Sequence, residues 1–201
     1  MTPRARPLPP EERRRAILQA VVPLLAEHGR DVSTRLIAEA AGVAEGTIFR
    51  VFPDKAALLL AAAEEAINPA DADAQWEFLL AGEDDLRAKV RIAAGRVITR
   101  IHLVMSVMFA VRGHLHAGAK AGAGPHGPPK FVIEAQAALH RQLTELFEPH
   151  ADELAVPPET AALALRALIF GSSRPEFDHV PSLTPDQIAD LILDGIQRKD
   201  T

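Results

Sequence analysis

The feature that most restricts the fold is the segment from Thr34 to Pro53, in which a glycine separates two short stretches with helical spacing of apolar residues. Gly42 can adopt the left-handed backbone conformation that ends a helix, because it has no Cβ atom. Ala38 is small enough for a second helix to cross close to the first. The apolar side chains expected to lock this pair onto a preceding helix are Ile37, Val43 and Ile48. The segment predicts a helix-turn-helix, which places its second helix in the major groove of DNA.

Apolar spacing, caps and breakers predict helices along the rest of the chain as well. Pro10 followed by two acids is typical of a first helical turn, Gly29 is a suitable C-cap, and either Ser33 or Thr34 caps the next helix. Pro23 lies inside the first helix, where proline costs about 3 kcal/mol or forces a kink, and the sequence offers no explanation for it. The predicted fold is all-α, with helices at residues 10–28, 34–41, 45–52, 55–67, 72–81, 84–99, 100–115, 130–148, 157–172 and 184–198.

Residues 13–60 closely resemble the DNA-binding domain of the TetR family of bacterial transcriptional regulators. The positions that match the family's pattern and spacing are Thr34, Ile37-Ala38, Ala41-Gly42-Val43, Gly46-Thr47, Phe49, Phe52-Pro53, Lys55 and Leu58. The resemblance implies a homodimer that binds an inverted repeat in double-stranded DNA. It also implies a divergent helical body that binds a small-molecule effector.

The resemblance further implies a role for individual residues of the helix-turn-helix. Thr34 and Arg35 would contact phosphates, and Lys55 would hold another phosphate together with the amides at the start of the fourth helix. Phe49 stands where the family usually has tyrosine, so it keeps apolar contact with a thymine methyl group or a sugar but loses the phenolic hydrogen bond. Arg50 would reach a phosphate or a guanine edge. The residues expected to enter the groove are Ala44, Glu45, Gly46 and Thr47.

Glu45 departs from the basic or small polar residue that the family often has at this position. Its carboxylate could accept a hydrogen bond from a cytosine amino group, which would make it a base-specific contact. It could equally be a solvated helix residue that only repels phosphate. Two interpretations are also open for Arg4 and Arg6, which form either a minor-groove arm or part of a passive tail.

Charge is distributed unevenly along the chain. The net charge is −5, but residues 1–55 contain nine basic and seven acidic residues, and the remainder contains 13 basic and 20 acidic ones. A basic N-terminal part on an acidic body fits contact with DNA at one end only. Together with the resemblance, this predicts a flexible tail at 1–9, a helix-turn-helix DNA-binding domain at 10–67, and a helical ligand-binding and dimerisation domain at 68–201.

The predicted body has more apolar residues between positions 98 and 133 than one narrow core stripe requires, which indicates a pocket for a largely apolar small molecule. His102 and Arg112 would supply its polar anchors. A filled core without a cavity is the alternative, because both arrangements have the same helical spacing. The predicted pocket residues are Trp76, His102, Met105, Met108, Phe109, Arg112 and Phe131.

The last two predicted helices have apolar faces with several small residues, which suit close helix packing. Two such hairpins related by a two-fold axis would form a four-helix bundle, as the family does. The residues predicted to form this dimer interface are Leu165, Leu168, Ile169, Ile188, Leu191 and Ile192.

Several classes of function lack support in the sequence. The chain has no cysteine, and it contains no nucleophile motif, phosphate-binding loop or dinucleotide fingerprint, so neither a catalytic residue nor a cofactor is predicted. No metal site is predicted from His102, His114, His116 and His126, because the middle two would point about 200° apart on a helix. Residues 1–10 lack the apolar core of a signal peptide, and the stretch 103–111 is short for a membrane span, so we expect a cytoplasmic protein.

The sequence therefore predicts a ligand-responsive DNA-binding regulator rather than an enzyme. Its leading form is a repressor that a small apolar molecule releases from a palindromic operator. Two alternatives stay open. One is a constitutive DNA-binding regulator without an inducer, and the other is a helical ligand-binding protein or enzyme whose helix-turn-helix is vestigial.

Overall fold

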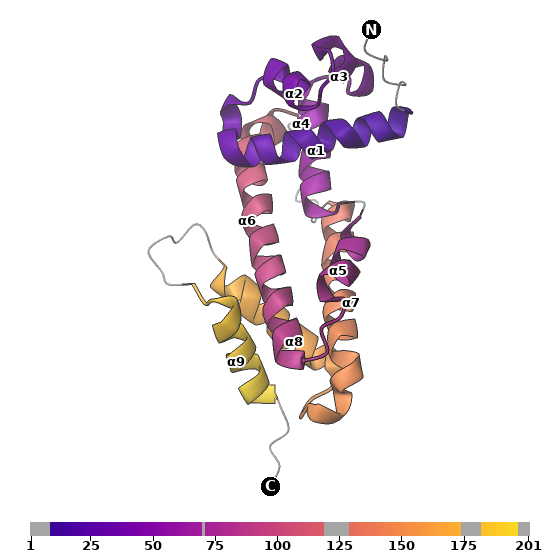
Figure 1. Ribbon diagram of the computed structural model, residues 1–201. Helices are drawn as coiled ribbons and strands as arrows, with labels where there is room; N and C mark the ends of the chain where they lie inside the picture. Colours follow the sequence, from indigo (N-terminus) through magenta and orange to yellow (C-terminus); the bar gives the residue numbers. More distant parts are fainter. Residues whose placement is uncertain (1–8, 70, 119–128, 174–181, 197–201) are drawn as a thin grey trace. The chain divides into compact units, whose positions relative to one another are not determined.

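The computed structural model describes residues 9–69, 71–118, 129–173 and 182–196, and every regular element in these ranges is a helix (Figure 1). The all-α prediction is confirmed, and most helix ends lie within one or two residues of the predicted ones. The elements are α1 (Pro10–His28), η1 (Gly29–Asp31), α2 (Thr34–Ala40), α3 (Glu45–Val51), α4 (Lys55–Ile67), α5 (Ala72–Leu80), α6 (Leu86–Gly118), α7 (Lys130–Phe147), η2 (Glu148–Glu153), α8 (Pro158–Ser172) and α9 (Pro185–Ile196).

The chain divides into two compact units, and the first contains α1 to α4 with the C-terminal part of α6. Its core is built on α1, whose Ile17, Val21 and Leu25 are buried at helical spacing. α4 packs against α1 and buries mainly leucine and alanine side chains. The residues that α6 adds to this core are Val107, Ala110 and Val111. α1 and α4 thereby form the base on which α2 and α3 are held.

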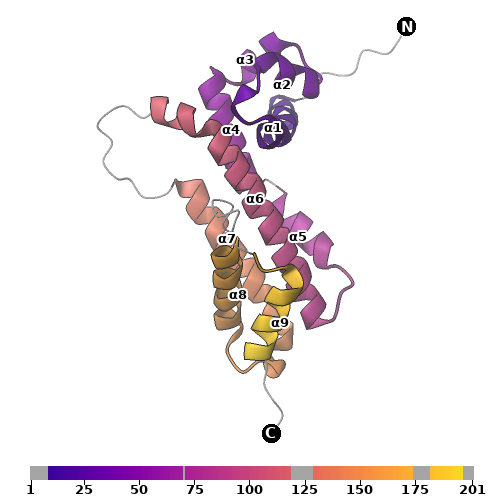
Figure 2. The same ribbon diagram turned by 90° about the vertical axis from the view of Figure 1, so that its left-hand side faces the viewer.

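The second unit contains α5, the N-terminal part of α6, α7, η2, α8 and α9. Within it, α8 packs against both α7 and α9 (Figure 2). The largest fully buried side chains of the second unit are Leu143, Phe147, Leu154, Leu165, Ile169 and Ile188. The inner faces of these helices therefore close a separate apolar core.

The single helix α6 replaces the two helices that were predicted at 84–99 and 100–115. That prediction was wrong because nothing at the expected break stops a helix. Thr99 fits the helix interior, since its hydroxyl donates to the carbonyl of Gly95 at 2.9 Å. A helix without a breaking proline continues as long as its faces find packing partners.

The two units meet in sequence within α6, because residues 103–118 cluster with the first unit. The predicted body at 68–201 had included this segment. By length and composition, the stretch Leu86–Arg112 of α6 could cross a membrane, because an 18-residue window within it has a mean hydropathy of 1.4. Its buried side chains, including Val90 and Val107, belong to the two cores of the protein.

Pro23 is accommodated on the outer side of α1, which continues through it. The missing amide would have bonded the carbonyl of Gln19, and both Gln19 and Pro23 are exposed. Water can bind a carbonyl on this face, so no buried polar group is left without a partner. This explains how the helix tolerates a residue for which the sequence offered no account.

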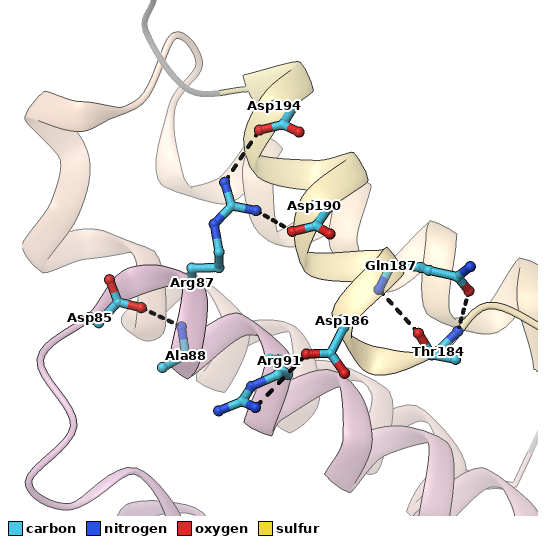
Figure 3. A network of polar contacts seen from close by, with 9 residues as sticks. All are labelled: Asp85, Arg87, Ala88, Arg91, Thr184, Asp186, Gln187, Asp190 and Asp194. Carbon is cyan, nitrogen blue, oxygen red and sulfur yellow. Dashed lines mark hydrogen bonds and ion pairs between the residues drawn. The ribbon is translucent and has the colours of Figure 1, made fainter.

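Side-chain caps set the starts of α6 and α9 (Figure 3). The Ala88 amide donates to the Asp85 carboxylate at 2.7 Å. At α9, the Thr184 amide donates to Gln187 Oε1 at 2.9 Å and the Gln187 amide donates to Thr184 Oγ1 at 3.2 Å. This reciprocal pair is a capping box, which satisfies two amides that have no partner within the helix.

Surface ion pairs also connect α6 to α9 (Figure 3). The Arg87 guanidinium donates to Asp190 and to Asp194, the latter at 3.2 Å, and Arg91 lies 3.8 Å from Asp186. The hydrogen bond to Asp194, with a further contribution from Asp190, raises the pKa of Arg87. These side chains are 43–72% exposed, which limits what the pairs add to stability.

We therefore expect the apolar face of α9, rather than its acidic face, to hold it in place. Ile188→Ala should lower the free energy of unfolding by about 2–5 kcal/mol, because Ile188 is 0% exposed. Arg87→Ala should lower it by less than about 1 kcal/mol. Urea unfolding followed by circular dichroism at one protein concentration measures both. Equal losses in the two variants would show that the ion pairs, not the core, hold α9.

Candidate nucleic-acid interface

The turn between α2 and α3 has the predicted geometry. Gly42 has a φ of +64°, in the left-handed region, and the Val43 amide donates to the carbonyl of Ala38 at 3.0 Å. Ile37 and Ile48 are both 0% exposed in the core that α1 builds. The prediction that these apolar faces lock the pair onto the preceding helix is confirmed.

Two short side chains cap the helices on either side of α3. The hydroxyl of Ser33 accepts a hydrogen bond from the Leu36 amide at 3.1 Å, so Ser33 rather than Thr34 caps α2. The Asp54 carboxylate accepts from the Ala57 amide at 2.7 Å and caps α4. One of the α4 amides that the resemblance assigned to a phosphate is therefore already bonded to a carboxylate.

α3 buries one side and exposes the other. Ile48 and, just beyond the helix, Phe52 face the core. Phe49 is 46% exposed, and Thr47 is half-buried. The other residues predicted to contact DNA from α3 and from the start of α2 are all exposed, namely Arg35, Ala44, Glu45, Gly46 and Arg50. The predicted contact residues thus lie where a ligand outside the unit can reach them.

Thr34 and Glu45 are brought together across the helix-turn-helix. The Thr34 hydroxyl donates to Glu45 Oε1 at 2.5 Å, although the two residues are 11 positions apart. Neither interpretation of Glu45 from the sequence had included a partner within the protein. The bond ties the first residue of α2 to the first residue of α3.

Lys55 reaches back toward the start of the helix-turn-helix. Its ammonium group donates to the carbonyl of Val32 at 2.9 Å. An ammonium group has three donors, so this bond leaves two that can bind a phosphate. The contact holds the ammonium at the carbonyl of Val32, two residues before Thr34 in the chain.

Arg14 is a residue of this region that the sequence did not single out. Its guanidinium lies 4.6 Å from the centre of the Phe52 ring, within cation–π range. Among three consecutive arginines, Arg13 to Arg15, nothing in the sequence distinguishes the one that stacks on an aromatic ring. The contact links α1 to the end of α3.

The predicted pocket residues divide between the two units. Trp76, His102 and Phe131 belong to the second unit, where Trp76 is part of the core, Phe131 is half-buried and His102 is exposed. The remaining four belong to the first unit, where Met108 packs against the core, Met105 is half-buried, Phe109 is 66% exposed and Arg112 is exposed. Two of the seven thus have an evident packing role. Of the four histidines weighed as metal ligands, only His102 has a described side chain.

Four of the predicted dimer residues are instead part of the protomer's own core. Leu165, Ile169 and Ile188 are 0% exposed, and Ile192 is 6% exposed. They pack within the second unit, so their side chains are not on its surface. Leu168 is half-buried, and Leu191 is 56% exposed. Only these last two are placed where a partner could contact them.

A second apolar stripe on α8 was missed. Leu163 is 56% exposed, Phe170 is 36% exposed, and Ala167 between them is exposed as well. These residues are spaced at i, i+4 and i+7, which is one face of a helix. The spacing was visible in the sequence. Because α8 is apolar on two sides, spacing alone could not show which side faces the core.

Known proteins resemble this chain in the helix-turn-helix and, at the level of the fold, over most of its length. Residues 17–62 match the family model for bacterial regulatory proteins of the tetR family. The solved structure of a TetR transcriptional regulator from Streptomyces coelicolor is 26% identical, with a TM-score of 0.62 over 93% of this chain and 99% of that one. A TetR-family regulator from Agrobacterium tumefaciens is 19% identical, with a TM-score of 0.58 over 94% and 100% of the two chains. The TetR-like regulator LfrR from Mycobacterium smegmatis, solved in complex with proflavine, is 22% identical, with a TM-score of 0.52 over 91% and 94%.

Two glycines of this region should respond oppositely to the same substitution. Gly42→Ala should lower the free energy of unfolding by about 1–2 kcal/mol, because its φ of +64° is unfavourable for a residue with a Cβ atom. Gly46→Ala should raise it by about 0.5–1 kcal/mol, because Gly46 lies inside α3. A Cβ atom at either position would meet nothing within 4 Å, so backbone conformation alone decides the sign. Urea unfolding of both variants checks this, and a stabilised Gly42→Ala protein would contradict it.

Proposed function

Since the chain belongs to the TetR family of bacterial transcriptional regulators, we propose that it is a repressor that binds an inverted-repeat operator as a homodimer. A small, largely apolar molecule bound in the helical body would release it from DNA. The observation that carries the proposal is α3, whose inner face is fixed by Ile48 while its outer face is exposed. One short helix covers only a few base pairs, so two copies are needed for a specific site. We place this activity in the cytoplasm and assign no enzymatic reaction to the chain.

The surface formed by the starts of α2 and α4 and the outer side of α3, here called the reading surface, would contact DNA in two ways that follow from residue chemistry. Lys55 and Arg35 would position the protein on phosphates, which carry no sequence information. Thr47 and Arg50 would contact base edges, and Gly46 would let the backbone of α3 come close to the groove. The fixed ammonium of Lys55 supports the first role, and the exposure of Arg50 and Gly46 supports the second.

We propose that the homodimer forms through the exposed apolar stripe on α8 together with Leu191 on α9. Leu163, Ala167 and Phe170 form the stripe. Two α8–α9 pairs related by a two-fold axis would bury these side chains in a four-helix bundle. Arg166, which lies 5.9 Å from the centre of the Phe170 ring, would remain at its polar rim.

The proposal of an apolar effector rests on three observations. Ile98 and Ile101 of α6 are only half-buried although this part of the helix is apolar. His140 on α7 has a buried Nδ1 atom without a hydrogen-bond partner in the described part of the chain, and a ligand hydroxyl or carbonyl could supply one. The LfrR structure was solved in complex with proflavine. Because α6 contributes to the cores of both units, it is a continuous element through which a ligand could act on the DNA-binding unit.

The reading surface is tested with two variants and a matched control. Lys55→Ala should weaken binding to all duplexes alike and reduce the slope of log K against log salt concentration by about one. Arg50→Ala should change the preferred sequence, with a loss of roughly 1–3 kcal/mol for a base contact. Arg141→Ala removes the same charge from the second unit and should do neither. Anisotropy titrations use a duplex selected by the wild-type protein from a random pool. Wild-type affinity in both test variants would exclude this surface.

The dimer interface is tested by placing a charge on the exposed stripe. Leu163→Glu and Leu191→Glu should each produce a folded monomer, because both side chains lie outside the protomer core. Phe78→Glu is the control, since Phe78 is 83% exposed on α5 and lies outside the stripe. Sedimentation velocity at micromolar concentration measures the mass. Dimers in both test variants would place the interface elsewhere.

The effector is tested with proflavine and a set of flat or apolar metabolites. A ligand at 100 times its Kd adds about 2.7 kcal/mol to the free energy of unfolding, so it should raise Tm measurably. The same compound should release the selected duplex, since affinities for two coupled ligands change by the same factor. If no compound does both, the chain is a constitutive DNA-binding regulator.

A further inference from the structure

The hydrogen bond between Thr34 and Glu45 lies at the surface that we propose faces DNA. Glu45 is exposed at the first position of α3, and Thr34 is half-buried at the first position of α2. A hydroxyl group donates one hydrogen bond, and Thr34 gives it to Glu45 Oε1. While that bond exists, Thr34 cannot donate to a phosphate. The pair therefore withholds a phosphate contact and keeps a carboxylate on the same surface.

Both effects oppose binding to DNA of arbitrary sequence. The duplex carries one negative charge per about 1.7 Å, so a carboxylate close to it is repelled wherever the protein lands. The positive end of the α3 dipole favours an acid at this position in the free protein. That interaction is present with or without DNA, so it does not offset the repulsion. Only a hydrogen-bond donor in the groove can offset it.

Among the base edges of the major groove, the N4 amino group of cytosine is the donor that suits a carboxylate. We propose that Glu45 is a specificity-determining residue that exchanges its donor, from the Thr34 hydroxyl in the free protein to a cytosine amino group on the operator. The exchange releases the Thr34 hydroxyl, which then donates to a phosphate. At a site without cytosine at this position, the bond to Thr34 persists and the carboxylate stays unfavourable. This inference rests on the proposed DNA-binding function and names the base that one residue requires.

Glu45→Gln removes the negative charge of residue 45 but keeps an oxygen that can accept the hydrogen bond from Thr34. The amide oxygen of glutamine still accepts from Thr34, so the link between α2 and α3 is kept. Without the charge, affinity for a scrambled duplex should rise, and the slope of log K against log salt concentration should steepen by about one. Preference for cytosine at the contacted position should fall, because the glutamine amide also pairs with other bases. Glu64→Gln is the matched control, because it removes the same charge from exposed residue 64 of α4.

The experiment uses the full-length chain, a duplex selected by the wild-type protein, a scrambled duplex, and the selected duplex with each cytosine replaced in turn. For the wild type, replacing the one cytosine in each half-site that Glu45 contacts should reduce affinity roughly 5- to 150-fold. For the Glu45→Gln variant, the same replacement should reduce affinity much less. If Glu45→Gln and Glu64→Gln keep the wild-type ratio between selected and scrambled duplexes, the role of Glu45 is overturned. If the wild type selects no duplex at all, the proposed function fails instead.

Thr34 provides a second measurement that does not depend on the charge of residue 45. Thr34→Val should weaken binding to the selected duplex and leave binding to the scrambled duplex nearly unchanged, because there the hydroxyl stays on Glu45. Thr34→Ser should restore the selected-duplex affinity. Equal weakening on both duplexes would show that Thr34 contacts phosphate at every site and would overturn the exchange.

Discussion

The orientation of α3 depends on the burial of one of its faces. Ile48 and Phe52 are at most 1% exposed and lie in the same core as Ile17 and Val21 of α1. Burying side chains of this size is worth about 1.5–3 kcal/mol each, so a rotation of α3 that exposed them would cost several times thermal energy. The directions of the outward residues are thus set by apolar packing on the other side of the helix. Gly42 makes this packing possible, because its φ of +64° turns the chain sharply enough for α2 and α3 to share the core.

In the second unit, too, apolar burial orients the helices, but here one helix also has apolar side chains that the core does not use. α8 uses Leu165 and Ile169 to close the protomer core and still has Leu163 and Phe170 at the surface. A helix that is apolar on two sides has one side left for another partner once its own core is complete. α9 has an acidic outer face that pairs with Arg87 and Arg91, and among its described side chains Leu191 is the large apolar one that is exposed. The polar and apolar parts of the two helices thereby limit where a second copy can pack.

The sequence predicted helices well where local chemistry defines their ends. Gly29 and Gly42 have positive φ at the predicted stops. Within the helix-turn-helix, the predicted inner residues are buried or half-buried and most predicted outer residues are exposed, since one short helix has one possible core side. Prediction failed where the sequence permits two solutions. Nothing local marks whether α6 breaks near Thr99 or which face of α8 is buried.

The pair formed by Thr34 and Glu45 shows a further reason why site chemistry is harder to predict than the fold. Each residue was interpreted alone, as a phosphate contact or as a base contact, because sequence spacing does not reveal a bond between residues 11 positions apart. Once the turn brings them together, each changes what the other can do for DNA. Residues 1–55 have only two more basic residues than acidic ones. A single carboxylate on the surface proposed to face DNA is therefore a large part of the net charge of this segment. When the excess of positive charge is this small, selectivity for a DNA sequence can come from an acidic residue that requires a hydrogen-bond donor on a particular base. Basic residues that attract the phosphate backbone of DNA supply affinity in addition.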